Sequence, residues 1–239
     1  MSLSRFIDRF QAILLDVCGT LMFNYDRFSE ADDHHSTYTQ LAGSALSPDE
    51  LYAIIHQLHL DIMASEQVEA NFDPFPSLGE FVRKVPACQE LPSEEQERIA
   101  LVFARHECGR IPASIADALL VLSETHPLGI LSNIWSLAGV FEAELERAGV
   151  RELLYPRVWS ADYGCIKPAE KIFRIALEEL DCPPDRVLYV GDTYLRDVVG
   201  ARNVGMGAAW VNPHGLPVPE GYGVQPDLVI HSVTDLLAR

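Results

Sequence analysis

The sequence predicts an α/β fold, with a doubly wound parallel sheet and an inserted α-helical cap domain. The first observation is that short apolar runs, each followed by a polar residue, alternate with helical patterns along the chain. The second is that one long stretch near the N-terminus holds helical patterns only. A chain of 239 residues with 48% hydrophobic residues is long enough for a core domain and a smaller inserted one.

Four apolar runs predict the buried strands of the sheet. They cover residues 12–15, 128–131, 187–190 and 208–211. Each run ends at a polar or turn-forming residue, as buried parallel strands do. A last short strand at 228–230 and a final helical turn follow a loop rich in Gly and Pro.

Helical patterns separate these strands and predict the crossover connections. They span residues 136–148, 168–180 and 197–204, the first stopped by Gly149. Together, strands and helices predict a Rossmann-like core made of residues 1–22 and 114–239. In such a sheet the carboxyl ends of the strands converge on one edge, where ligands bind.

Residues 23–113 interrupt this alternation and predict a helical cap. Ser47-Pro48-Asp49-Glu50 has the pattern of a capping box. A helical face follows it, made of Leu51, Ile54, Ile55, Leu58 and Ile62. A second cap helix is expected to begin near Ser93.

Charge and cysteine content restrict the partners. Asp and Glu number 35 against 18 Lys and Arg, for a formal net charge of -17, so we expect neither nucleic acid nor a membrane as partner. An anionic small-molecule substrate would need a local cluster of cations or a metal. Five cysteines without Cys-x-x-Cys spacing, and no signal-like N-terminus, fit a cytoplasmic protein. We expect a monomer or a homodimer.

Polar residues at or just beyond the predicted strand ends carry the chemistry. They are Asp16, Ser132 with Asn133, Lys167, and Asp192 with Asp197. Carboxylates on neighbouring strands repel unless a cation lies between them, and Mg²⁺ prefers such oxygen ligands. A hydroxyl and a lysine at the same edge could hold phosphoryl oxygens. The set therefore predicts metal-assisted phosphoryl transfer.

The same residues form motifs that resemble those of the haloacid dehalogenase (HAD) superfamily. Asp16-Val17-Cys18-Gly19-Thr20-Leu21 resembles its first motif, and Leu131-Ser132-Asn133 its second. Ile166-Lys167-Pro168 resembles the third motif, and Gly191-Asp192-Thr193 with Asp197 the fourth. The position of the insert matches the branch with a helical cap after the first motif. The resemblance extends over nearly the whole chain.

The resemblance implies a role for each matching residue. The protein would be a hydrolase that cleaves a small phosphorylated metabolite through an aspartyl-phosphate on Asp16. Mg²⁺ would be held by Asp16, Asp192 and the backbone carbonyl of Cys18. Asp197 would hold the metal through water or orient Lys167. The phosphate would be bound by Ser132, the backbone near Asn133, and Lys167, with Thr20 shaping the turn behind the nucleophile.

Cys18 departs from the pattern of the family's phosphatases. Those enzymes carry a second Asp at this position, which protonates the leaving alcohol. A thiol of ordinary pKa ~8.5 is a poor substitute, and loss of a general acid typically costs ~10²–10⁴ in rate. We therefore expect slow turnover of ordinary monoesters, or substrates whose leaving group needs no proton.

Three alternatives stay open. A 2-haloacid dehalogenase also lacks the second Asp, and Arg27 is the nearest candidate to bind a substrate carboxylate. A phosphonate hydrolase needs a cap lysine, and Lys84 is the one the insert offers. A descendant that binds ligand without turnover is the third.

Histidines in the insert invite a metal-binding interpretation. Asp32-Asp33-His34-His35 is interpreted first as a solvated cap loop and second as a metal site. His56 and His59, one helical turn apart, are interpreted as a partly exposed helix face.

Overall fold

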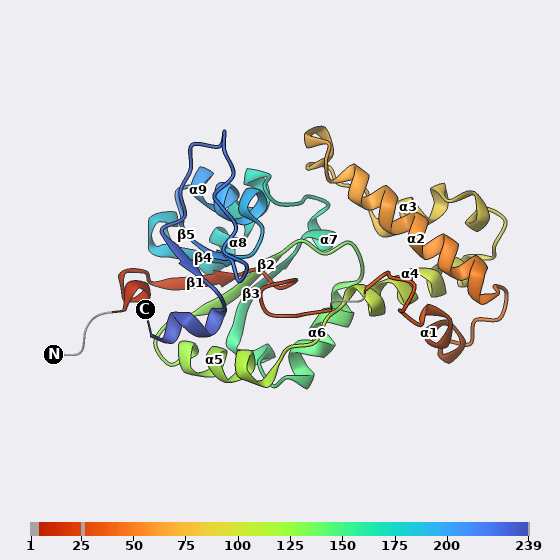
Figure 1. Cartoon of the computed structure of the whole chain (residues 1–239), viewed down its shortest axis with the longest axis horizontal. Coiled ribbons are helices and arrows are strands. Elements are labelled where there is room, and N and C mark those ends of the chain that lie inside the picture. Colours follow the sequence, from red (N-terminus) through yellow and green to blue (C-terminus); the bar gives the residue numbers. More distant parts are fainter. Residues whose placement is uncertain (1–4, 25–26, 239) are drawn as a thin grey trace.

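The computed structural model describes residues 5–24 and 27–238, and it has the predicted α/β architecture (Figure 1). In this part of the chain six strands form one parallel sheet in the order β3-β2-β1-β4-β5-β6. The strands are β1 (Ala12–Leu15), β2 (Leu128–Ser132), β3 (Leu154–Trp159), β4 (Val187–Gly191), β5 (Gly207–Val211) and β6 (Leu228–Ile230). Five of them are the strands expected from the sequence. The exception is β3, because Tyr155 is exposed and Pro156 and Arg157 interrupt its apolar pattern.

Helices cover both faces of the sheet (Figure 1). On one face lie α5 (Ala113–Ser123) and α6 (Ala138–Arg147), and on the other α8 (Glu170–Leu180) and α9 (Gly200–Asn203). Alternate residues of β1 serve the two faces, since Ile13 and Leu15 belong to the first hydrophobic cluster and Leu14 to the second. Both clusters are buried, as a central parallel strand requires. The sheet is thereby a rigid platform for residues at its carboxyl edge.

The crossover helices begin at different residues than predicted. The helix expected over 136–148 is α6, which starts at Ala138, because Trp135 and Ser136 are bound to Glu107 and stay in the loop. The helix expected from residue 168 starts at Glu170. The helix expected over 197–204 is a π-helix (Tyr194–Val199) continued by α9. π-helical turns are frequent at functional sites.

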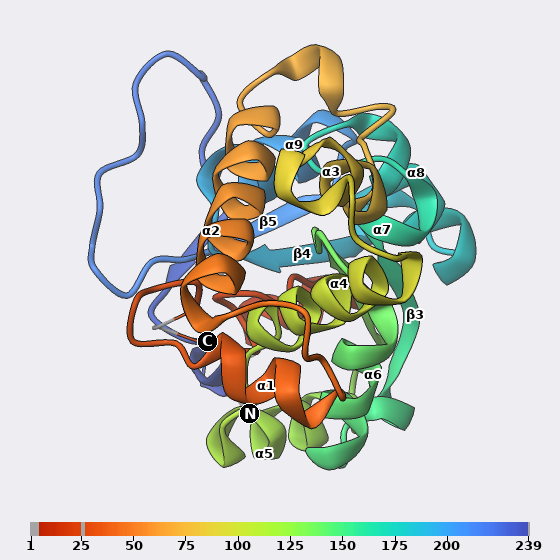
Figure 2. The same ribbon diagram turned by 90° about the vertical axis from the view of Figure 1, so that its right-hand side faces the viewer.

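Helices α1 (His34–Gln40), α2 (Pro48–Ser65), α3 (Leu78–Lys84) and α4 (Ser93–Glu107) lie together beyond the carboxyl edge of the sheet (Figures 1 and 2). We call residues 23–113 the insert. Helix α2 has the expected capping box between Ser47 and Glu50. Its predicted apolar face is buried in a third hydrophobic cluster, which also takes in Trp135 and Ile166 of the core. The insert and the core are thus packed against each other.

Backbone hydrogen bonds reinforce this packing. The N–H of Ile166 donates to the carbonyl of Phe72 at 3.0 Å, and the N–H of Phe75 donates to the carbonyl of Gly164 at 2.8 Å. Both bonds join the insert to the loop that carries Lys167. The insert is therefore fixed to that loop by backbone hydrogen bonds.

The remaining described elements are short. They are α7 (Ser160–Tyr163) and the 3₁₀ helices Phe6–Arg9, Glu69–Asn71, Pro86–Cys88, Arg151–Leu153, Pro184–Arg186 and Val233–Leu237. None of the helices in the described ranges is both long and apolar enough to cross a membrane.

Candidate active site

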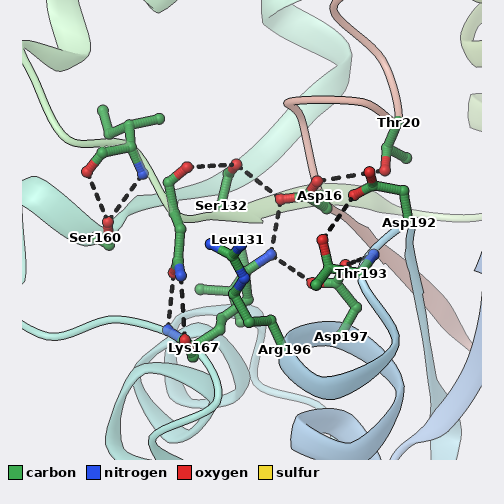
Figure 3. Close-up of polar contacts among 12 residues, drawn as sticks. Asp16, Thr20, Leu131, Ser132, Ser160, Lys167, Asp192, Thr193, Arg196 and Asp197 are labelled. Carbon is green, nitrogen blue, oxygen red and sulfur yellow. Dashed lines mark hydrogen bonds and ion pairs between the residues drawn. The ribbon is translucent and has the colours of Figure 1, made fainter. Parts of the chain in front are cut away.

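The predicted polar residues converge at the middle of the sheet's carboxyl edge. Asp16 follows β1, Ser132 ends β2, and Asp192 follows β4, and β1 lies between β2 and β4. Figure 3 shows these side chains pointing toward one another, with Lys167 reaching in from the loop before α8. Strand order therefore explains why residues so far apart in the sequence meet.

Asp16 is the centre of the site and is only 5% exposed. Its Oδ1 accepts hydrogen bonds from Ser132 Oγ at 2.8 Å and from Lys167 Nζ at 2.7 Å. Its Oδ2 accepts a longer one, of 3.3 Å, from Thr20 Oγ1. A carboxylate held by a hydroxyl and an ammonium group has its orientation fixed, which a nucleophile requires.

Lys167 is buried among acceptors. Besides Asp16, its Nζ contacts Asp197 Oδ1 at 2.6 Å and the Tyr189 hydroxyl at 2.8 Å. Tyr189 in turn donates to the carbonyl of Leu131 at 2.6 Å. Burial lowers the pKa of Lys167, but Asp16 and Asp197 outweigh it and the pKa lies above its ordinary value. Lys167 is therefore a permanent cation in the site.

Asn133 fixes the backbone of Lys167. Its Oδ1 accepts from the N–H of Lys167 at 2.8 Å, and its Nδ2 donates to the Lys167 carbonyl at 3.1 Å. The Asn133 side chain is thus used to position lysine rather than to bind phosphate. Only the backbone near Asn133 stays a candidate for phosphate binding, as the motif implies.

Asp16, Asp192 and Asp197 form the predicted acidic cluster. Each offers a carboxylate oxygen, and these oxygens lie within 4.8 Å of one another. Burial and the nearby charges of Asp16 and Asp197 raise the pKa of Asp192 to about 7. A divalent cation would relieve this repulsion, so the donor set fits Mg²⁺. Gly19 keeps the approach close, because a Cβ there would lie 2.4 Å from Oδ2 of Asp192.

Asp197 uses both of its oxygens within the protein. Oδ1 contacts Lys167, and Oδ2 accepts from the N–H of Thr193 at 2.7 Å. Burial raises the pKa of Asp197, while Lys167 acts to lower it. Of the two roles implied for Asp197, this geometry favours orienting Lys167.

Cys18 lines the cavity above Asp16, where the resemblance places it. Burial, with smaller contributions from Glu107 and Asp16, raises the pKa of its thiol well above the ordinary value. The thiol is therefore protonated and uncharged at neutral pH. A group in this state neither withdraws a proton from water nor readily gives one to an alkoxide.

The cavity over these residues has a volume of about 260 Å³. Its cationic lining is Lys167, Arg27 and Arg196, in a chain of net charge -17. The strongly acidic composition predicted that an anionic substrate would need a local cluster of cations, and these three side chains form one at the cavity. Arg196 was not predicted as a site residue. The one feature of the sequence that could have indicated it is its position between Asp192 and Asp197.

Glu107 and Glu66 of the insert shape the cavity wall through Trp135. Glu107, at the end of α4, accepts from the backbone N–H of Trp135 at 2.7 Å and from the Ser136 hydroxyl. Glu66 accepts from the indole N–H of Trp135 at 2.8 Å and pairs with Arg196 at 3.0 Å. Burial raises the pKa of Glu107 to about 7. No local pattern marks either glutamate, since only the packing of insert on core brings them here.

The other candidate site residues of the insert lie in different places. Arg27 lines the cavity, with its guanidinium 5.2 Å from the ring centre of Trp135. Lys84 is exposed at the end of α3, beside Phe81, and is not among the cavity-lining residues of the described chain. His56 stacks on Tyr52, and His59 packs against Phe28 and Trp135. Within the described ranges neither histidine belongs to a group of three or more possible metal ligands.

Sequence comparison finds relatives among phosphatases. A family model described as HAD-hydrolase-like matches residues 164–236. Pyrimidine 5'-nucleotidase YjjG of Escherichia coli is 34% identical over 130 residues, 54% of this chain and 56% of that protein. Glyceraldehyde 3-phosphate phosphatase of Methanothermobacter thermautotrophicus is 32% identical over 104 residues, 42% of this chain and 44% of that protein. The chain thus spans about half the length of these relatives.

Solved structures match the fold over nearly its full length. A 2-haloacid dehalogenase from Pseudomonas syringae has a TM-score of 0.67 at 21% identity, covering 96% of this chain and 99% of that one. A HAD phosphatase from Thermococcus onnurineus has a TM-score of 0.61 at 23% identity, covering 95% and 96%. With the family match over residues 164–236 and the predicted motifs at one sheet edge, these findings agree that the chain is similar to hydrolases of the haloacid dehalogenase superfamily and shares their fold.

Proposed function

We propose that this protein is a magnesium-dependent phosphatase that cleaves a small phosphorylated metabolite through an aspartyl-phosphate on Asp16. The observation that carries the proposal is the position of the Asp16 carboxylate, 2.8 Å from the Ser132 hydroxyl and 2.7 Å from the Lys167 ammonium group. A nucleophile thus lies within hydrogen-bond distance of two donors for phosphoryl oxygens, and Asp16 and Lys167 line the same cavity. The names of the sequence relatives, a nucleotidase and a phosphatase, support this reaction class.

The reaction has two displacements at phosphorus. A carboxylate oxygen of Asp16 attacks phosphorus, the bond to the leaving oxygen breaks, and that oxygen keeps the electron pair. Water then attacks the phosphorus of the aspartyl-phosphate, which regenerates the carboxylate and releases inorganic phosphate with the water's protons shared between phosphate and solvent. Ser132 and Lys167 donate hydrogen bonds to the phosphoryl oxygens in both steps.

Mg²⁺, when bound by Asp16, Asp192 and the backbone carbonyl of Cys18, supplies positive charge that offsets the repulsion between carboxylate and phosphate. The protein's own cations add to this charge, since Arg27, Lys167 and Arg196 all line the cavity. Asp197 keeps the ammonium group of Lys167 directed at Asp16. The site as a whole selects a dianionic group.

Cys18 narrows the choice of leaving group. A protonated thiol replaces the carboxylic acid that would give its proton to a leaving alkoxide. We therefore assign to the protein substrates whose leaving group is stable as an anion, such as acyl or aryl phosphates. Alkyl phosphates would be turned over more slowly by ~10²–10⁴, the usual contribution of a general acid.

The first test is hydrolysis of p-nitrophenyl phosphate with and without Mg²⁺. Its leaving group is a weakly basic phenolate, so the assay examines the nucleophile and the metal without requiring a general acid. We expect release of p-nitrophenolate that depends on Mg²⁺ and disappears with EDTA. Release that is unaffected by EDTA, or no release at any Mg²⁺ concentration, contradicts the proposal.

Dehalogenation of a 2-haloacid is the second candidate, favoured by two observations. Cys18 offers no acid, and displacement of halide requires none. Arg27 lies in the cavity, where it could bind a substrate carboxylate. In this reaction Asp16 would displace halide from carbon to form an ester, and water would then hydrolyse the ester. Release of chloride from 2-chloropropionate in EDTA would favour this candidate over the phosphatase.

A further inference from the structure

A second group of metal-ligating side chains lies in the insert, apart from the acidic cluster at Asp16. It consists of Asp32, just before α1, His34, the first residue of α1, and His106, in the last turn of α4. One ligand atom from each lies within 4.8 Å of the other two. We call these residues the insert cluster. It joins two helices that are far apart in the sequence.

His34 gives the independent sign that the insert cluster receives a ligand. The side chain is only 3% exposed, and its Nε2 is, within the described chain, the one buried side-chain nitrogen or oxygen without a hydrogen-bond partner. This nitrogen faces the cluster, 3.4 Å from Oδ2 of Asp32. A buried polar atom without a partner is costly, and a ligand at this point would satisfy it.

The other two residues are already oriented. Nδ1 of His106 lies 2.7 Å from Oδ1 of Asp32, and its Nε2 lies 2.7 Å from Oγ1 of Thr37. Oδ2 of Asp32 accepts from the backbone N–H of Phe28 at 3.0 Å. A histidine ligand bound through one ring nitrogen and held through the other is the usual arrangement in metal sites. Thr37 and Phe28 would act as these outer supports.

The neighbouring residues of the loop are used differently. Asp33 caps α1 by accepting from the N–H of Ser36 at 2.9 Å. His35 turns toward the ring of Tyr38. The four-residue run Asp32 to His35 is therefore not a site by itself. The third ligand comes from α4, and only the fold brings it there.

Two imidazole nitrogens and one carboxylate oxygen suit a borderline divalent ion better than Mg²⁺, which prefers oxygen. Three protein ligands leave one position of a tetrahedral zinc ion for water. Beside the cluster is a cavity of about 470 Å³, lined by Asp32, His34 and Tyr52 among others. Water can reach the open position from this cavity.

We propose that Asp32, His34 and His106 form a zinc site that ties α1 to the end of α4. The site is independent of the phosphatase proposal, but it adjoins the wall of the active-site cavity. His106 is followed by Glu107, which lines that cavity and binds Trp135. On the other side, Phe28 directly follows Arg27 in the sequence, and the ring of Phe28 stacks on those of His34 and Phe103. Zinc would thus hold Glu107 and Arg27, which both line the active-site cavity, in place.

The test is calorimetric titration of the full chain with Zn²⁺ in excess Mg²⁺, which is added to compete for the proposed magnesium site at Asp16. We expect one Zn²⁺ per chain with a Kd of about 1 μM or lower. Asp32→Asn and His34→Ala should each weaken binding at least ~100-fold. His214→Ala, which removes an exposed imidazole from a loop, is the matched control and should bind as the wild type does.

Thermal unfolding without added metal shows which variants fold. In Asp32→Asn the amide oxygen can still accept a hydrogen bond from the backbone N–H of Phe28. If His34→Ala does not fold, the zinc affinity of Asp32→Asn therefore tests the proposal. Asp16→Asn should keep the zinc affinity of the wild type, which separates the two metal sites. A wild-type Kd for Zn²⁺ of about 1 mM or higher would overturn the proposal. Unchanged affinity in folded Asp32→Asn would also overturn it, by placing the ion elsewhere.

Discussion

The ammonium group of Lys167 lies 2.7 Å from Oδ1 of Asp16, although 151 positions separate the two residues in the sequence. Both side chains are buried, and Asp197 contacts the same ammonium group at 2.6 Å. One cation therefore balances carboxylates that would otherwise repel each other in a medium of low dielectric constant. Stability and the proposed chemistry would thus depend on the same contact.

Lys167→Met should lower the free energy of unfolding by about 3–5 kcal/mol, because it leaves buried carboxylates without their cation. Denaturant unfolding with and without Mg²⁺ measures this loss. Lys171→Met is the matched control, since Lys171 is about half exposed in its ion pair with Asp73 and should change stability by less than about 1 kcal/mol. Equal losses in the two variants would contradict a structural role for the buried pair.

Asp16→Asn should reduce p-nitrophenyl phosphate turnover by at least roughly 10³-fold, because the amide is no nucleophile for phosphorus. The fold should be kept, since an amide oxygen can still accept from Ser132. Steady-state rates, with circular dichroism as a check of folding, test the prediction. Asp185→Asn, at an exposed position, should keep the wild-type rate. Substantial turnover by folded Asp16→Asn would exclude Asp16 as the nucleophile.

Cys18→Asp should raise the rate on alkyl phosphates by up to ~10²–10⁴, and the rate on p-nitrophenyl phosphate much less. The reason is that the new carboxylic acid protonates an alkoxide, which a phenolate does not need. The ratio of the two rates is the measurement, because it cancels differences in active enzyme. Cys182→Asp, at a half-buried cysteine that is not among the residues lining the cavity, controls for added charge. A ratio equal to that of the wild type would show that another group supplies the proton.

Glu107→Ala should lower the free energy of unfolding by about 1–3 kcal/mol, because the buried N–H of Trp135 loses its acceptor. Glu107→Gln keeps an acceptor oxygen and should lose less. Chemical denaturation of both variants gives the comparison. The control is Glu97→Ala on the exposed face of the same helix, for which we expect a change within about 0.5 kcal/mol. If alanine and glutamine at position 107 were equally stable, the hydrogen bond to Trp135 would not be the cause.

The sequence predicted the residues at the carboxyl edge of the sheet better than those around them, for a physical reason. Asp16, Ser132 and Asp192 stand next to short apolar strands, so local pattern alone places them at the carboxyl edge of a parallel sheet. Glu107 and Tyr189 carry no such signal, because a glutamate in an amphipathic helix and a tyrosine in an apolar strand have ordinary structural explanations. Their positions follow from long-range packing, which periodicity does not encode.

The missed strand has a similar explanation. Strand β3 lies at the edge of the sheet, where Tyr155 can remain exposed and Pro156 is tolerated, so its apolar pattern is broken. The insert cluster shows the same limit, since Asp32 and His34 are local but His106 is not. Contacts between residues far apart in the sequence form both strand β3 and the insert cluster, and a local sequence pattern does not show such contacts.

Glu144 supplies a pH-dependent part of the stability, which can be tested apart from catalysis. It lies on α6, accepts from the backbone N–H of Ile111 at 2.8 Å, and pairs with Arg110 at 2.7 Å and Arg147 at 2.6 Å. Burial acts to raise the pKa of Glu144, but the hydrogen bonds from Arg147, Ile111 and Arg110 outweigh it, so the pKa lies below its ordinary value.

A carboxyl group with a lowered folded-state pKa stabilises the fold above its unfolded pKa, and this contribution disappears as the pH falls through the folded value. We therefore expect Glu144→Gln to be less stable than the wild type at pH 7 and to lose less stability between pH 7 and pH 4. Unfolding in denaturant at both pH values measures the difference. Glu146→Gln, an exposed neighbour on the same helix, should follow the wild type. A wild-type pH dependence in Glu144→Gln would mean that the acid sensitivity comes from other carboxylates.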